Sequence, residues 1–184
     1  MNEPSNGMMP AHALEKIMEH VFPRERATLY GLGVGILVGI GNSLLDLEFP
    51  INVELAVSLI GAMALVVVLH EGVHGGVGKL LGHRPIFGVQ PPLVFTTFRE
   101  AIPRGHFIAI AIAPLLVLDA IFVAVYAMGV FRLFMDLCFA VNTIGTMGDV
   151  WIVLKLSRHA RGTVVQDTKQ GIEVWAKKEP RAPL

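Results

Sequence analysis

The segment His70–His74 reads H-E-G-V-H and lies inside a long apolar run. On a helix, residues four apart lie on the same face, so His70 and His74 can bind one zinc ion. Glu71 would then lie beside a zinc-bound water and is the candidate catalytic general base. A charged, metal-binding sequence at membrane depth is costly to keep unless it serves a function. The motif therefore predicts zinc-dependent peptide hydrolysis at a site inside the bilayer.

Catalytic zinc usually has three protein ligands, so two histidines need a third. The third ligand should lie at the same depth in the membrane as the histidines, and depth therefore indicates which acid it is. The two histidines lie nine and five residues before Lys79, or ~14 and ~8 Å at a helical rise of ~1.5 Å per residue. Asp149 lies six residues before Lys155, or ~9 Å on the same measure. Asp119 lies ~20 Å beyond His106, which is too deep to join them. Asp149 is therefore the expected third zinc ligand, and Asp119 is expected to make a polar contact between helices.

Asn142 precedes Asp149 by two helical turns and lies on the same helix face. Its amide is a candidate catalytic group that could hydrogen-bond a developing oxyanion or hold the substrate backbone, and it could equally make an amide contact between helices. Glycines flank the H-E-G-V-H motif and Asp149. They would let the helices that carry these residues approach closely enough to share an ion, or they would serve ordinary packing. They are Gly72, Gly75, Gly76, Gly78, Gly145 and Gly148.

Histidines elsewhere in the chain carry weaker signals. His83 and His106 lie near a predicted membrane boundary and are expected to be solvated, whereas His20 and His159 lie outside the apolar runs and indicate nothing. The alternative to a metal site is that the motif histidines only hydrogen-bond between helices. Ligand type favours zinc over iron or cobalt.

The elements that must position these residues are apolar helices. Of the 184 residues, 53% are hydrophobic and only 16% are charged, which is typical of a small polytopic membrane protein and not of an ordinary soluble domain. The formal net charge is zero, so no nucleic-acid surface is indicated, and the lone Cys138 is expected to pack. Four apolar runs are each long enough for a spanning helix of roughly 20 residues. They are Thr28–Leu47, Leu55–Leu81, Phe107–Val130 and Phe134–Leu156.

The charges that flank these runs predict the orientation. Cations gather before the first run, between the second and third, and after the fourth, so the positive-inside rule places both termini of a multi-pass cell-membrane protein in the cytoplasm. Residues 1–27 would form a cytoplasmic segment, 28–156 the transmembrane metalloprotease-like domain, and 157–184 a second cytoplasmic segment. Within the first, Ala11–Phe22 has apolar residues at helical spacing, which favours an interfacial helix or a short helix capping the bundle.

Two short pieces favour extended backbone. Ile86–Phe98 is rich in β-branched and aromatic residues around Pro91 and Pro92, which predicts a hairpin-like loop between helices two and three. Thr163–Val165 and Ile172–Trp175 flank a polar turn and predict a small cytoplasmic hairpin. The expected fold class is an all-α membrane protein with about four transmembrane helices and these two hairpins.

H-E-G-V-H on one membrane helix, followed by N-T-I-G-T-M-G-D at residues 142–149, resembles the site-2 protease class of intramembrane metalloproteases. The short length and the piece V-V-Q-D-T-K-Q-G-I-E-V-W are more similar to the small membrane proteins called "putative zincin peptidase", which are related to that class. The later site-2 motif usually reads N-P-x-x-x-x-D-G, and here no proline follows Asn142 and Val150 follows the aspartate.

This resemblance, over roughly Leu55–Trp175, implies zinc at His70, His74 and Asp149, with Glu71 as catalytic acid and base. It also implies that Ile86–Phe98 acts as an edge strand on which a substrate unwinds. The expected partners are a membrane protein or peptide substrate and the lipid bilayer.

Two other functions stay open from the sequence. One is a non-catalytic zinc-binding scaffold or regulator, although structural zinc would not need Glu71. The other is a divalent-metal transporter, for which Asp119 would be the deep ligand and for which more spans would be expected.

Overall fold

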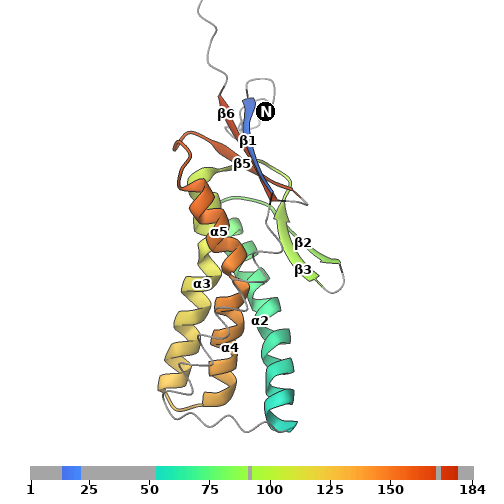
Figure 1. Cartoon of the computed structure of the whole chain (residues 1–184), viewed down its shortest axis with the longest axis vertical. Helices are drawn as coiled ribbons and strands as arrows, with labels where there is room; N and C mark the ends of the chain where they lie inside the picture. The colour runs from blue at the N-terminus through green and yellow to red at the C-terminus, as the bar shows by residue number, and fades with distance from the viewer. Residues whose placement is uncertain (1–13, 22–52, 91–92, 169–170, 178–184) are drawn as a thin grey trace, which may run out of the picture.

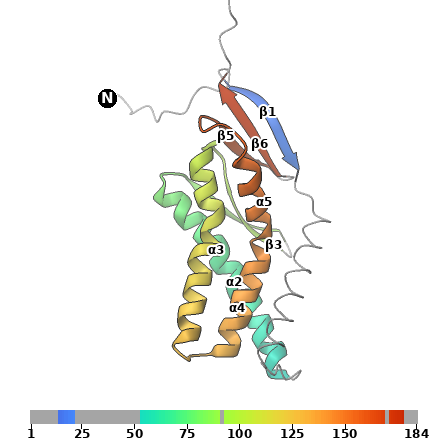
Figure 2. The same cartoon turned by 60° about the vertical axis from the view of Figure 1, so that its left-hand side comes forward.

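The computed structural model describes residues 14–21, 53–90, 93–168 and 171–177, and it shows a helical bundle with a β-sheet at one end (Figures 1 and 2). The helices are α2 (Val53–Leu80), α3 (Arg104–Ala127), α4 (Arg132–Gly145) and α5 (Met147–Leu156). Their bounds confirm three of the predicted apolar runs as helices. The first predicted span, residues 28–47, lies outside the described residues.

Among the described residues, three helices are long and apolar enough to cross a membrane: α2, α3 and the continuous stretch Arg132–Leu156. The last comprises α4 and α5, and its hydrogen-bond ladder continues through Thr146, whose N–H donates to the carbonyl of Asn142 and whose carbonyl accepts from Val150. Large apolar side chains remain exposed along α2 and α3, as is expected of helix faces that contact lipid.

The end of the bundle carries a four-stranded antiparallel sheet in the order β1-β6-β5-β4. Its strands are β1 (Leu14–Val21), β6 (Gly171–Lys177), β5 (Val164–Thr168) and β4 (Ile102–Pro103). Pairing of β5 with β6 confirms the predicted C-terminal hairpin. The sheet also corrects the all-α fold class, because the chain is mostly helical with a small β-sheet.

The expected helix over 11–22 is wrong where the structure describes it, because Leu14–Val21 is strand β1. Its partner is β6, with Glu19 opposite Glu173, and Lys16 bridges both carboxylates at 3.0 Å. Covering an exposed edge of β6 satisfies backbone groups of both strands, and that long-range pairing outweighs a short helical pattern.

The predicted loop hairpin is confirmed as β2 (Pro85–Gln90) paired with β3 (Leu93–Phe98). It lies beside α2 (Figure 1), and its aromatic rings pack directly on glycines of that helix. A Cβ at Gly78 would lie 2.5 Å from the Phe98 ring, and a Cβ at Gly75 would overlap the Phe87 ring. These two glycines therefore admit the hairpin, which agrees with the packing role, one of the two roles open from the sequence.

Two apolar cores hold the bundle and sheet together. One joins the sheet to the helix ends and is formed by Phe98, Ile102, Phe107, Ile110, Leu156, Val165, Ile172 and Val174. The other lies between the helices and is formed by Ala62, Val66, Leu118, Phe122 and Cys138. Cys138 is fully buried as a free thiol, which confirms its expected packing role. The H-E-G-V-H motif lies on α2 between these two cores, since Val73 packs against the second and Val77 against the first.

Candidate metal centre

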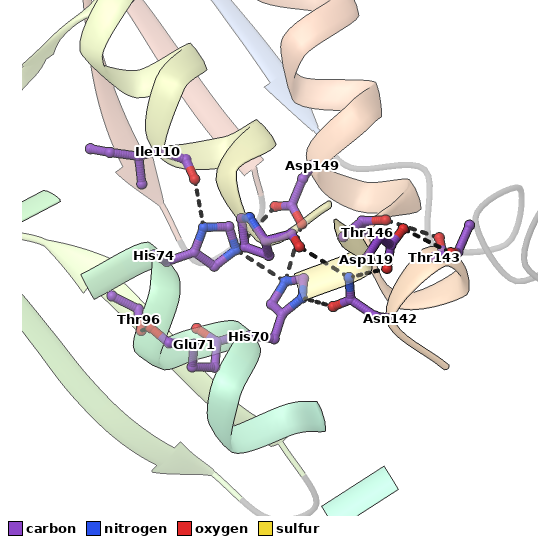
Figure 3. Close-up of polar contacts among 11 residues, drawn as sticks. His70, Glu71, His74, Thr96, Ile110, Asp119, Asn142, Thr143, Thr146 and Asp149 are labelled. Carbon is purple, nitrogen blue, oxygen red and sulfur yellow. Dashed lines mark hydrogen bonds and ion pairs between the residues drawn. The ribbon is translucent and has the colours of Figure 1, made fainter. Parts of the chain in front are cut away.

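His70 and His74 on α2 meet Asp149 in the first turn of α5 (Figure 3). The Nε2 atom of His70 lies 3.2 Å from Asp149 Oδ2, and Nε2 of His74 lies 3.5 Å from Oδ1. The two Nε2 atoms are 3.0 Å apart. The helical spacing of the histidines, which places both rings on one face of α2, supports this arrangement.

One ligand atom from each of these three side chains lies within 4.8 Å of the others. The side chains are only 13%, 12% and 17% exposed, in the order His70, His74 and Asp149. Two imidazole nitrogens and one carboxylate oxygen are a donor set that catalytic zinc sites use, with a fourth position left for water. The residues therefore fit zinc, and the structure brings together the ligands expected from depth.

The hydrogen bonds of the two Nδ1 atoms explain why both Nε2 atoms face the same point. His70 Nδ1 lies 3.1 Å from Asn142 Oδ1, and His74 Nδ1 lies 2.9 Å from the backbone oxygen of Ile110. Both oxygens only accept hydrogen bonds, so each Nδ1 carries a proton and donates it, and Nε2 is the nitrogen that each ring turns toward Asp149. This contact pattern is the usual support of a metal-binding histidine.

Asn142 is fully buried, and its amide is engaged on both sides. Its Oδ1 accepts from His70, and its Nδ2 donates to Asp119 Oδ1 at 2.8 Å and to the Pro114 carbonyl at 3.1 Å. Of the two roles open from the sequence, the structure shows the contact between helices. A contact with substrate stays a prediction, and the observed geometry makes Asn142 a support for His70.

Asp119 lies outside the ligand group and makes polar contacts between helices, as its depth predicted. Its Oδ1 accepts from Asn142, and its Oδ2 accepts from the Thr143 hydroxyl at 3.0 Å. The carboxylate therefore anchors Asn142, which in turn contacts His70. Sequence spacing alone did not reveal this chain of three residues.

Glu71 lies between the two histidines, and the β2–β3 hairpin contacts it from outside the bundle. Thr96 Oγ1 on β3 donates to the Glu71 carbonyl at 2.9 Å (Figure 3). The next residue, Thr97, donates to Asp167 Oδ2 on β5 at 2.7 Å. Burial raises the pKa of Asp167 above its usual range, and the nearby charge of Glu71 acts in the same direction. Sequence spacing does not reveal these three polar residues, because only the fold brings β3 and β5 to the motif.

The remaining histidines of the described segments form pairs, which corrects the expectation that they are solvated or uninformative. His83 Nε2 lies 3.0 Å from His106 Nδ1, and the side chain of His83 is 12% exposed. His20 Nε2 on β1 lies 2.9 Å from His159 Nε2. These pairs connect separate elements and lie outside the ligand group of Asp149.

The chain is 27% identical over 146 residues to an "Uncharacterized 24.7 kDa protein in gap 5'region" of Pyrococcus woesei, a match that covers 76% of this chain. This chain spans 65% of the length of that relative. No solved structure matches the chain. Residues 63–164, more than half of the chain, match the family described as "Putative zincin peptidase", and this segment contains the three clustered side chains and Glu71. The chain therefore belongs to the family described as "Putative zincin peptidase".

Proposed function

We propose that this protein is an intramembrane zinc metallopeptidase that hydrolyses peptide bonds in membrane-embedded or membrane-adjacent segments. The observation that carries the proposal is the meeting of His70, His74 and Asp149 on helices that are long and apolar enough to cross a membrane. Family membership supports the reaction class. The three apolar helices support the location.

Each residue of the site has a role that follows from its chemistry. His70, His74 and Asp149 would hold zinc, which when bound lowers the pKa of water to about 7 and polarises a carbonyl. Glu71 accepts a proton from the attacking water and delivers it to the leaving amine. Asn142 keeps the His70 ring oriented, with Asp119 behind it. The two supporting residues thus hold His70 in place, one directly and one through the amide.

The β2–β3 hairpin is the proposed site of substrate presentation. A helical peptide bond is shielded, so cleavage requires the substrate to become extended, and addition to a strand edge would supply that conformation. In the described part of the chain, β2 and β3 pair only with each other, so each has one outer edge. The hairpin touches the carbonyl of Glu71 through Thr96, which would bring an added strand next to the base.

The orientation is a further part of the proposal. Basic residues cluster at the sheet end of the described bundle, at Lys79, Arg84, Arg104 and Lys155. The positive-inside rule then places this end, the zinc site and both termini toward the cytoplasm. The expected substrate is a membrane protein or peptide whose scissile bond lies near the cytoplasmic face.

The test combines metal content with hydrolysis in detergent-purified, full-length protein. Wild type is compared with His70→Ala, Asp149→Ala and Glu71→Gln by metal mass spectrometry. The hydrolysis probes are fluorescein-labelled casein and quenched-fluorescent peptides with a single apolar span. We expect about one zinc per chain in wild type and in Glu71→Gln, loss of zinc in the two ligand variants, and cleavage by wild type alone. Mass spectrometry of the products would show whether the apolar span itself is cut.

Two results would contradict the proposal in different ways. Stoichiometric zinc with equal, background-level cleavage by wild type and Glu71→Gln would indicate a zinc-binding scaffold. Absence of stoichiometric metal in folded wild type would remove the zinc site itself. A transport function would need zinc uptake into proteoliposomes that is lost on Asp119→Ala, although both oxygens of Asp119 are engaged with Asn142 and Thr143.

A further inference from the structure

Helix α3 contains a proline in its interior, Pro114, and this side chain is fully buried. Proline has no N–H, so residue 114 cannot donate the usual helical hydrogen bond to the carbonyl four residues earlier, which is that of Ile110. Ile110 is 4% exposed, so water does not readily reach this oxygen. A carbonyl without a donor in apolar surroundings is costly, and neighbouring groups usually satisfy it in membrane helices.

The donor that satisfies Ile110 comes from the metal site. His74 Nδ1 lies 2.9 Å from the Ile110 oxygen (Figure 3). Because a carbonyl only accepts, this contact requires a proton on Nδ1, and Nε2 is the nitrogen that faces Asp149. The oxygen that proline releases on α3 is thus the oxygen that orients His74 on α2.

The same turn of α3 also supports the other histidine. The Pro114 carbonyl accepts from Asn142 Nδ2 at 3.1 Å, and Asn142 Oδ1 contacts His70 Nδ1 at the same distance. Two backbone oxygens, one turn apart on α3, therefore reach both imidazoles, one directly and one through an amide. Neither oxygen belongs to a side chain that the motif or the ligand set would reveal.

We propose that Pro114 is a positioning residue of the metal site. By removing the N–H that would pair with the Ile110 carbonyl, it reserves that oxygen for His74 Nδ1 and holds the ring with Nε2 toward Asp149. This inference rests on the proposed zinc site, although the orientation of His74 exists without metal. An alanine at 114 would restore a competing N–H inside α3 and let the helix close its ladder around Ile110.

The test variant is Pro114→Ala in the full-length protein in detergent. Zinc affinity is measured by competition with a chromophoric chelator, and the His74 tautomer is read from ¹⁵N-histidine NMR of metal-free protein, with His74→Gln used for assignment. We expect zinc affinity to fall about tenfold, the lower end for loss of an outer contact, because the carbonyl keeps a second lone pair. We also expect His74 to change from the Nδ1–H tautomer to a mixture.

Val117→Ala is the matched control, since it alters an exposed side chain one turn further along α3 and leaves the Ile110 carbonyl unchanged. It should bind zinc like wild type. Unchanged zinc affinity together with a pure Nδ1–H tautomer in Pro114→Ala would overturn the proposal, because proline would then only shape the helix.

A second measurement keeps the inference testable if Pro114→Ala does not fold. Metal-free wild type must show His74 with a proton on Nδ1, and a neutral ring protonated on Nε2 alone would overturn the proposal directly. This measurement also separates the positioning role of Pro114 from the proposed zinc peptidase function. Wild type that binds no zinc but keeps His74 protonated on Nδ1 contradicts the proposed function and leaves the positioning by Pro114 in place.

Discussion

Asn142 Oδ1 accepts a hydrogen bond from His70 Nδ1 at 3.1 Å, which ties the last turn of α4 to the motif helix α2. Seven residues later on the same helical face, Asp149 contacts the opposite nitrogen of the same ring. One imidazole is therefore held at both nitrogens by residues two turns apart. This relationship explains how helix packing, rather than the motif alone, sets the direction in which His70 Nε2 points.

Replacing Asn142 tests that support. Asn142→Ala removes the acceptor for His70 and leaves the Asp119 carboxylate with one donor fewer, so we expect zinc affinity to fall about 10- to 100-fold. Chelator competition on purified protein measures the change. Thr143→Ala is the control, since it removes only the other hydrogen bond to Asp119 and should keep zinc affinity within a few fold.

Zinc should stabilise the folded protein through the three clustered side chains. A ligand that binds only the native state stabilises it by about 4 kcal/mol at a concentration 1,000 times its dissociation constant. Thermal unfolding in detergent should therefore shift upward on adding zinc to metal-free wild type and to Glu71→Gln. A similar shift in Asp149→Ala would show that zinc binds elsewhere.

Four glycines of α2 provide a matched set for the hairpin contact. Gly78→Ala should destabilise by about 1–3 kcal/mol, because its Cβ would meet the ring of Phe98, which is 6% exposed. Gly75→Ala should cost less, since the Phe87 ring is 58% exposed and can turn away. Gly72→Ala and Gly76→Ala meet nothing within 4 Å and should be neutral or stabilising by up to about 1 kcal/mol. Thermal unfolding ranks the four, and an equal loss in all of them would contradict the packing argument.

The pair His20 and His159 predicts acid sensitivity of the sheet end. Burial, and then the neighbouring His159, lowers the pKa of His20 below its ordinary value of about 6.5. The unfolded chain then takes up a proton that the folded chain resists, so the contribution is present above pH ~6.5 and is lost as pH falls below it. His20→Gln should flatten the decline of unfolding temperature between about pH 7 and 5.

His159→Gln provides the companion to that experiment. If the two rings act as a pair, each single variant should flatten the pH profile, and the double variant should add little to either. Additive effects of the two substitutions would indicate independent titration and contradict the coupling of β1 to the region after α5.

Much of the site could be predicted because local spacing and membrane depth constrain it. The i,i+4 histidines had to share a helix face, and counting from the basic boundary selected Asp149 over Asp119, which the structure places in separate groups. Apolar runs long enough to span a bilayer predicted α2, α3 and the α4–α5 stretch within a few residues. Two short β-rich segments likewise predicted both hairpins.

The prediction over 14–21 failed for a physical reason. Eight residues with mixed polarity have weak intrinsic preference, and an available edge of β6 made them a strand. The packing partner of Gly75 and Gly78 could not be predicted either, because a small residue indicates close approach but not which element approaches.

The candidate ligands and the candidate base could be identified from the sequence, because a helix and a membrane boundary give meaning to the spacing of two imidazoles and two carboxylates. The orientation of each ring depends on the tertiary structure, since the partners of His70 and His74 are an amide on α4 and a backbone carbonyl on α3. Pro114 shows from the sequence that the Ile110 carbonyl lacks its helical donor. Which group then donates to this carbonyl depends on the helix that packs against α3. Local covalent rules act within a few residues, whereas hydrogen-bond partners across helices are set by the packing of the whole bundle.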